Sequence, residues 1–492
     1  MKEMSLEQTD SEQSDVRIKA SAAIKWSLVT EVMVKLITPI TQVALAHILA
    51  PEAFGVVATV TMVISFADML SDAGFQKYLV QHEFSDEGDL FANANVAFWT
   101  NLTVSLSLWL LISVFSNPLA TAVGCDGLGL VLVIAGSSLP LTALSSIQLA
   151  MYHRNFNFKD LLAVRVAAAS VPLFVTIPLA ILGLNYWSLV IGIIAGNVVN
   201  AVALTARSSW KPSLHYSWKR LLSMMSFSAW TLLESISIWL TSWVGTFILG
   251  SVLSPYYLGL YKTSIGMVNA AMGIITSATT PILFSALSRF QNDEKQFQQV
   301  FFEMQKKVAF VVVPLGVGIF VFRDFATELL LGPQWHEAAA MLGYWGLSSS
   351  FVIILSHYAS EVFRSKGRPR LSFYNQCVYL CILIPATYFS AQLGFDVFAL
   401  AAAITRVVGI GVGFLFLCAV HFPITRMCSN IISITLCASA MGVLGSCLLA
   451  FNASLMFSFF WIVVCAVAYA VFCLLFPDTR AVLFALLKRV RR

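Results

Sequence analysis

The sequence has few charged residues. Only 11% of its 492 residues carry a charge, whereas a soluble domain has about 25%. Hydrophobic residues make up 58% of the chain, and no water-soluble fold could bury so large a share. This composition predicts an all-α integral membrane protein.

The motifs of soluble enzymes are also missing. The chain has no G-x-x-x-x-G-K-[ST], G-x-S-x-G or H-E-x-x-H pattern, which argues against an ATP-hydrolysing subunit, a serine hydrolase and a zinc protease. Its polar connections are too short to hold a soluble catalytic domain. We therefore expect no enzymatic activity and no cofactor. The functional residues must lie in the membrane-spanning helices.

Cysteine use excludes two further classes of site. The nine cysteines lie mostly in apolar stretches of the final third, and none forms a C-x-x-C pair. We interpret them as small residues that face lipid or other helices, because a metal site or a disulfide framework would need a recognisable spacing.

Fourteen apolar stretches are each long enough for the roughly 20 residues that cross a bilayer. An even number of spans puts both termini on one side of the membrane. The predicted spans are 24–48, 54–76, 92–116, 127–151, 160–182, 186–207, 223–250, 258–286, 306–331, 338–362, 371–392, 396–420, 430–450 and 455–476.

Basic residues are confined to alternate connections and the two tails. All but four of the 30 lysines and arginines lie there or at the adjoining ends of spans, and this one-sided distribution marks the cytoplasmic face. The net charge of +5 therefore indicates topology and contact with membrane lipids, and nucleic acid is not an expected partner. The four exceptions are Lys35, Lys262, Arg323 and Arg406.

Two short segments recur at nearly one offset. Leu49–Gly55 resembles Leu253–Gly259, and Gly183–Leu189 resembles Gly394–Leu400. Repeats of six helices run in the same direction through the membrane, and transport sites commonly lie between them. We therefore divide the chain into a disordered tail, two six-helix lobes, and an added helix pair with a basic tail: 1–17, 18–210, 211–423 and 424–492.

Ionisable residues within the predicted spans are functional candidates, because each costs at least about 2.5–3.5 kcal/mol to insert. Glu31 and Lys35 lie one helical turn apart and can neutralise each other. The repeat offset brings Glu31 next to Glu234, so each lobe has a carboxylate at nearly the same depth. The alternative is a packing ion pair in the first span and a carboxylate at interfacial water in the second.

Four cations are candidate anion contacts. Arg406 lies near the middle of its span, too deep to reach water easily. Arg165 is nearer the cytoplasmic end, where its side chain can also extend to the interface. Lys262 and Arg323 lie toward the outside, where they could line the mouth of an anion pathway. Arg323 could instead pair locally with Asp324 or Glu328.

Three more residues are candidates for binding a coupling ion, in addition to Glu31 and Glu234. Asp68 lies at the inner end of the second predicted span. His357 and Glu361 are one turn apart and could relay protons, but Glu361 is also close to the basic segment 364–370 and could pair with it.

The segments Leu49–Gly55, Asp72–Phe75 and Leu258–Tyr261 resemble those of Wzx-like polysaccharide flippases. These belong to the polysaccharide transport (PST) group of the multidrug/oligosaccharidyl-lipid/polysaccharide exporter superfamily. The resemblance implies two six-helix lobes forming a V around a central cavity. It also implies movement of an undecaprenyl-diphosphate-linked oligosaccharide across the bacterial inner membrane, for surface or exported polysaccharide.

The same resemblance implies roles and partners. Lys35 and Arg406 would contact the diphosphate, and Glu31 and Glu234 would contact sugar or a coupling ion. Coupling to a proton or sodium gradient is common in the superfamily, and a polysaccharide polymerase with its chain-length machinery is an implied partner.

Three other functions remain open from the sequence. A drug or cation antiporter of the same superfamily would need a cavity rich in carboxylates, against which Lys35 and Arg406 argue. A membrane-embedded polymerase usually carries a large outer loop, and none is present. A structural assembly partner would not need buried charges at matched depths.

Overall fold

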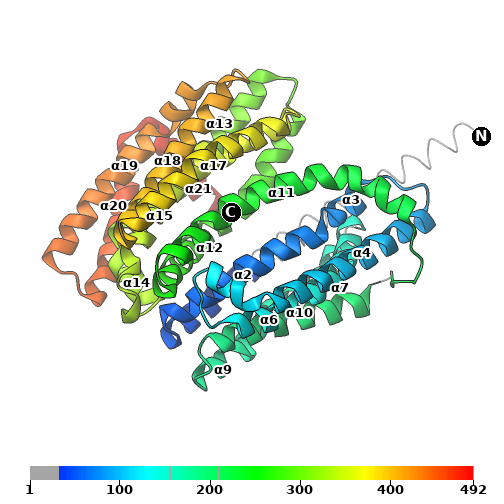
Figure 1. Cartoon of the computed structure of the whole chain (residues 1–492). Coiled ribbons are helices and arrows are strands. Elements are labelled where there is room, and N and C mark those ends of the chain that lie inside the picture. Colours follow the sequence, from blue (N-terminus) through cyan, green and yellow to red (C-terminus); the bar gives the residue numbers. More distant parts are fainter. Residues whose placement is uncertain (1–32, 156, 209, 491–492) are drawn as a thin grey trace, which may run out of the picture. The chain divides into compact units, whose positions relative to one another are not determined.

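The computed structural model describes residues 33–155, 157–208 and 210–490, without the side chains of 158, 226–231, 369 and 486–490. In these ranges the chain is helical and has no strand (Figure 1). Twelve helices are long and apolar enough to cross a membrane, so the predicted all-α membrane class is confirmed. The count of fourteen stays a prediction, because the helix Met33–Ile48 is shorter and α17 (Pro369–Gln392) is not among the twelve.

The chain forms two compact units. Unit 1 contains the described residues up to Leu49 and Val56–Trp239, and unit 2 contains Ala50–Gly55 and the chain from Leu240 onward. Helices α2 and α11 each run through both units. The division into two six-helix lobes and an added pair stays a prediction.

Unit 1 is built around α7 and α10. Helix α10 packs on α7 and α8, while α4 and α3 pack on α7. Gly192 of α10 allows a close approach, because a Cβ there would lie 1.7 Å from Thr176 Oγ1. The helices of this unit are α2 (Pro51–Asp72), α3 (Phe75–Gln81), α4 (Glu87–Val114), α5 (Ser116–Ala122), α6 (Gly129–Gly136), α7 (Ser138–Arg154), α8 (Phe158–Phe174), α9 (Thr176–Ile181), α10 (Tyr186–Arg207) and the first part of α11 (Trp218–Val252).

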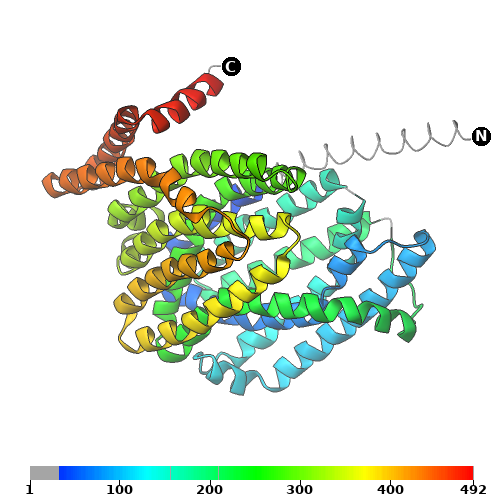
Figure 2. The ribbon, with the colours of Figure 1, turned by 90° about the horizontal axis from the view of Figure 1, so that it is seen from above.

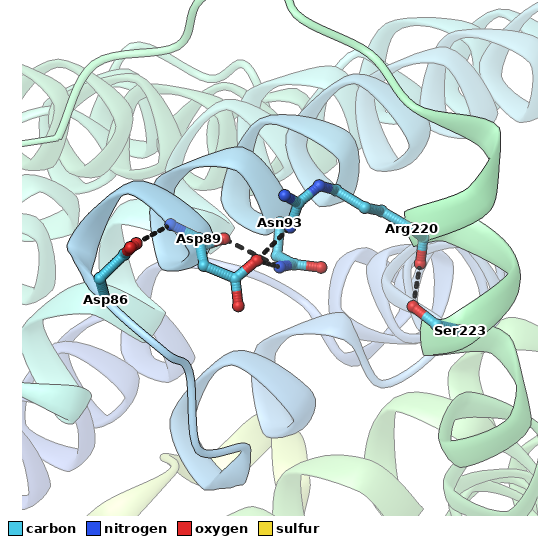
Figure 3. Close-up of polar contacts among 5 residues, drawn as sticks. All are labelled: Asp86, Asp89, Asn93, Arg220 and Ser223. Carbon is cyan, nitrogen blue, oxygen red and sulfur yellow. Dashed lines mark hydrogen bonds and ion pairs between the residues drawn. The ribbon is translucent and has the colours of Figure 1, made fainter.

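A polar network joins the start of α11 to the start of α4 (Figure 3). Asp86 caps α4 by accepting a hydrogen bond from the Asp89 amide at 2.6 Å, which satisfies one of the free amides at a helix start. The Asp89 carboxylate binds Arg220 of α11. Asn93 donates to the Asp89 carbonyl oxygen at 2.8 Å.

Unit 2 has α15 at its centre. Helix α15 packs on α12, α13 and α18, while α17 packs on α18 and α19 packs on α13. Figure 2 shows the orange and red helices α19, α20 and α21 at one side of this unit, and Lys306 of α13 binds Asp478 of α21 at 3.2 Å. The helices are the end of α11, α12 (Pro255–Arg289), α13 (Glu294–Val321), α14 (Arg323–Leu330), α15 (Ala338–Val352), α16 (Tyr358–Ser365), α17, α18 (Phe395–Cys418), α19 (Ile424–Phe451), α20 (Leu455–Leu475) and α21 (Pro477–Val490), with a 3₁₀ turn at Pro333–Trp335.

A π-helical turn, Ile353–His357, joins α15 to α16. The fully buried Gln305 of α13 donates to the carbonyl oxygens of Ile354 at 3.3 Å and Met427 at 3.2 Å. Asn430 of α19 donates to the Gln305 amide oxygen at 3.0 Å. One amide side chain therefore links the π turn to α13 and α19, and such turns often mark functional sites.

Candidate functional site

The side chain of Arg406 lies against α15 in unit 2. Its Nη1 atom donates to the hydroxyls of Ser349 at 2.8 Å and Ser348 at 3.0 Å, and to the Trp345 carbonyl oxygen at 3.3 Å. Helices α15 and α18 are in extensive contact, so the arginine reaches its partners directly. These three acceptors fix one nitrogen of the guanidinium group.

The remaining nitrogens of Arg406 keep donor capacity. An arginine carries five N–H donors, and in the described chain the hydrogen bonds of this guanidinium group are all made by Nη1. No described carboxylate lies within 4.0 Å of it. An unpaired cation within a membrane span is a default functional site, and its free donors suit an anionic ligand.

An aromatic ring lies over this cation. The Arg406 Cζ atom lies 3.7 Å from the centroid of the Trp345 ring, a distance at which a cation–π interaction contributes about 0.5–2 kcal/mol. Trp345 donates through Nε1 to Asn269 of α12 at 3.3 Å. The Tyr261 ring lies edge-on to Trp345, with centroids 6.3 Å apart. Aromatic faces and a polar amide are typical of sites that bind sugars as well as anions.

The sequence reasoning found Arg406 but missed its partners. Ser348 and Ser349 are buried, at 3% and 1% exposure, and belong to a run of three serines within an otherwise apolar helix. The serine run in the sequence could have indicated partners for Arg406, because buried hydroxyl groups need hydrogen-bond partners. Trp345, one turn earlier, lies on the same helix face.

Lys262 lies near the start of α12 in the same unit. Its Nζ atom is 3.8 Å from the centroid of the Trp243 ring of α11, and no described carboxylate lies within 4.0 Å of it. Gly245 of α11 makes room for the neighbouring Tyr261, because a Cβ there would lie 2.7 Å from the tyrosine hydroxyl. Lys262 is therefore a second cation held on an aromatic face.

Glu31, one partner of the predicted pair with Lys35, lies outside the described residues. Lys35 is half-buried in the helix Met33–Ile48. Glu234 is 44% exposed, and its carboxylate is 3.9 Å from Lys77 Nζ. A partly exposed carboxylate is what the alternative considered from the sequence, a carboxylate at interfacial water, would give. A role for Glu234 in binding stays a prediction.

Two other predicted cations have different surroundings. The side chain of Arg323 packs against Gly343, where a Cβ would lie 2.9 Å from its Cδ, and its Nε atom is 3.9 Å from Asp324. The local pairing considered from the sequence is therefore present. Arg165 is half-buried in α8, and its role as an anion contact stays a prediction.

Asp68 lines a cavity of about 190 Å³ within unit 1. Its Oδ1 atom accepts a hydrogen bond from Thr142 of α7 at 2.6 Å. The hydroxyl of Ser65, on the same wall, accepts from Trp239 at 3.0 Å, and Asn197 of α10 contributes an amide. This cavity, which we call the Asp68 cavity, combines one carboxylate with several neutral oxygen atoms.

His357 and Glu361, the two residues of the predicted proton relay, each contact another residue in the structure. His357 shares a hydrogen bond with Thr280 of α12 at 3.3 Å. The buried Glu361 binds Arg364 at 3.2 Å, which is the pairing with the basic segment considered from the sequence. The π turn ends at His357, and Glu361 follows one turn later in the regular helix α16. Both remain predictions as coupling residues.

The described residues contain no cluster of three or more His, Cys, Asp or Glu side chains that could hold a metal ion. All nine cysteines are free.

Sequence comparison identifies related proteins. Residues 44–340 match the family model described as "Polysaccharide biosynthesis protein". The succinoglycan biosynthesis transport protein ExoT of Rhizobium meliloti is 25% identical over 331 residues, which cover 67% of this chain and 66% of ExoT, just under two thirds of it. The lipopolysaccharide biosynthesis protein WzxC of Escherichia coli is 22% identical over 396 residues, covering 77% of this chain and 76% of WzxC.

Structural comparison identifies the fold. The lipid II flippase MurJ, in an inward closed conformation, superposes with a TM-score of 0.75 at 14% sequence identity. The match covers 91% of this chain and 98% of MurJ. At this identity the similarity concerns the fold alone, and the chain has the same fold as MurJ.

Proposed function

This chain belongs to the polysaccharide biosynthesis protein family, and we propose that it is a flippase that moves a lipid-linked oligosaccharide across the membrane. The family match over residues 44–340 carries this proposal. It is supported by the twelve apolar helices and by the similarity of the fold to a lipid II flippase. The chain would act as a transporter and would make or break no covalent bond.

The substrate class is an oligosaccharide on an undecaprenyl diphosphate carrier. Such a molecule presents a diphosphate that needs cations, a hydroxyl-rich headgroup that needs polar and aromatic walls, and a prenyl tail that can stay in lipid. Arg406, with free guanidinium donors beside the Trp345 ring, fits the first two needs. Lys262 on the Trp243 ring adds a second cation.

Other residues predicted from the sequence have further roles in the proposal. Lys35 would contact the diphosphate, and Glu31 and Glu234 would contact sugar or a coupling ion. Arg165 and Arg323 would assist entry or release of the anion. Two six-helix lobes would rock around a central site, so that only the headgroup must cross the membrane.

The Asp68 cavity is our proposed site for a coupling ion. A carboxylate within a membrane span commonly takes part in proton or cation coupling. Asp68 could take up a proton, and the hydroxyl and amide oxygen atoms around it could help to bind a sodium ion. Asp68 fits this role better than Glu361, because Glu361 already has a cationic partner. It also fits better than His357, because Asp68 lines a cavity with several neutral oxygen atoms.

The setting follows from the same proposal. The chain would lie in a bacterial inner membrane with both termini in the cytoplasm, as the distribution of basic residues predicts. It would supply flipped oligosaccharide to a polysaccharide polymerase and its chain-length machinery.

Reconstitution tests the function. Proteoliposomes that contain the purified protein should move a fluorescent oligosaccharide on a polyprenyl diphosphate to the opposite leaflet, while protein-free liposomes should not. The antiporter alternative predicts instead the uptake of a lipophilic cation against a proton or sodium gradient. Cation uptake without lipid movement would overturn our proposal.

A further inference from the structure

A polar pocket lies at one end of unit 2, where three helix connections meet. Gln291 and Asn292 follow α12, Lys366 and Arg368 follow α16, and Val420 and His421 follow α18. They enclose about 270 Å³. We call this site the Arg368 pocket; the charge distribution of the chain predicts that it faces the cytoplasm.

The polar side chains of the lining can all donate hydrogen bonds. Lys366 and Arg368 are cations, Gln291 and Asn292 carry amide NH₂ groups, and His421 has a ring N–H. The lining contains no carboxylate. Donors that converge from three connections suit a ligand with several anionic oxygen atoms.

One of the two cations is already paired, and the other is not. Lys366 Nζ lies 2.9 Å from the Glu294 carboxylate and 5.0 Å from the centroid of the Phe297 ring. Arg368 is exposed and forms no ion pair within the described chain. Its guanidinium group is therefore available as a fork for two oxygen atoms.

The backbone fixes the position of both ends of the pocket. The Arg368 amide donates to the Phe363 carbonyl oxygen at 2.9 Å, and the His421 amide donates to that of Cys418 at 3.0 Å. His421 has φ +53°, a left-handed conformation that few residues other than glycine adopt. A specific turn thus sets the backbone conformation of this lining residue.

Basic residues in a cytoplasmic connection need no ligand to explain them, because topology alone favours them. Topology does not require them to converge, however. Within the segment 364–370, Arg364 turns back to Glu361, while Lys366 and Arg368 line the cavity together with two amides from another connection. The neutral donors Gln291 and Asn292 contribute nothing to topology.

We propose that the Arg368 pocket binds a phosphoryl group, carried either by a soluble phosphate or diphosphate or by a lipid headgroup. Arg368 is its principal contact, and Gln291, Asn292 and His421 complete the set of donors around its oxygen atoms. This site differs from the Arg406 site and does not depend on the proposed flippase activity.

Ligand-dependent thermal stability tests the proposal. The purified full-length protein in neutral phosphatidylcholine nanodiscs is titrated with inorganic pyrophosphate at constant ionic strength. We expect a saturable increase in the unfolding temperature, and we expect Arg368→Gln to weaken the apparent affinity by about tenfold or more. The control is Arg370→Gln, which removes the same charge two residues away but does not line the pocket.

A second arm identifies the source of the phosphoryl group. If the ligand is a lipid, pyrophosphate has no effect and nanodiscs that contain phosphatidic acid stabilise the wild type more than Arg368→Gln. If neither probe stabilises the protein in a saturable way, the proposal is wrong. It is equally wrong if Arg370→Gln weakens binding as much as Arg368→Gln, because the effect would then be one of general charge.

Discussion

Gly55 and Gly259 lie backbone to backbone in unit 2, and each accommodates a carbonyl group from the segment of the other. A Cβ on Gly55 would be 1.8 Å from the Pro255 carbonyl oxygen, and a Cβ on Gly259 would be 1.9 Å from that of Pro51. These are equivalent positions in the repeated segments. The close approach is therefore reciprocal, while the division into two repeated lobes stays a prediction.

Replacing either glycine with alanine should destabilise the protein. The new methyl group would meet backbone atoms that cannot move aside like a flexible side chain, and overpacking of this kind costs about 1–3 kcal/mol. The measurement is the thermal unfolding temperature in detergent. Gly318→Ala and Gly411→Ala are the controls, because a Cβ at those helical positions meets nothing within 4 Å. Equal unfolding temperatures in all four variants would contradict the close approach.

Removal of the Gln305 side chain should also lower stability. Gln305→Leu removes the side-chain donor to the carbonyl groups of Ile354 and Met427, and an unsatisfied buried polar group costs about 1–3 kcal/mol. The unfolding temperature should therefore fall. Gln299→Leu, at an exposed position of the same helix, should have little effect. A similar loss in both variants would show that the amide bridge contributes nothing specific.

The Asp89–Arg220 pair (Figure 3) should make only a modest contribution. Both side chains are partly exposed, at 29% and 37%, and exposed pairs contribute about 0.2–1 kcal/mol. A double-mutant cycle with Asp89→Asn and Arg220→Gln should give a coupling energy in that range. The coupling should shrink at high salt, since mobile ions screen exposed charges. A coupling energy that does not change with salt would contradict this account.

Neutralising Asp68 should uncouple transport from an ion gradient. Asp68→Asn keeps an oxygen atom for the Thr142 hydroxyl but removes the charge, so flipping should continue and lose its response to an imposed pH or sodium gradient. Flipping in proteoliposomes with and without each gradient measures this. Asp324→Asn, which alters a carboxylate that is 84% exposed, should retain the response. A wild-type response in Asp68→Asn would exclude the Asp68 cavity as the coupling site.

Helix positions could be read from the sequence because the bilayer sets a minimum length for apolar stretches. The predicted span 186–207 coincides with α10, Tyr186–Arg207. Breaks within spans were not predicted: the chain interrupts its helices at Ser137, at Val175 and at Phe322. Such breaks depend on local proline geometry and on neighbouring helices, and hydropathy does not record these.

The candidate site was only partly predictable for a related reason. Insertion cost singles out Arg406 from the sequence alone, whereas its hydrogen bonds to Ser348 and Ser349 depend on how α15 packs on α18. Likewise, the spacing places His357 and Glu361 one turn apart on one helix, but it does not predict the hydrogen bond of His357 with Thr280 of α12. Spacing predicts neighbours along one helix, and only tertiary packing brings different helices together.

In the proposed function, Arg406 contacts the diphosphate of the transported lipid. The most direct test of this contact is the flipping rate of Arg406→Gln in proteoliposomes, with Arg480→Gln at the exposed start of α21 as the matched loss of charge. We expect Arg406→Gln to flip at least about tenfold more slowly while reconstituting as efficiently as the wild type, and Arg480→Gln to flip normally. A wild-type rate in Arg406→Gln would contradict the account.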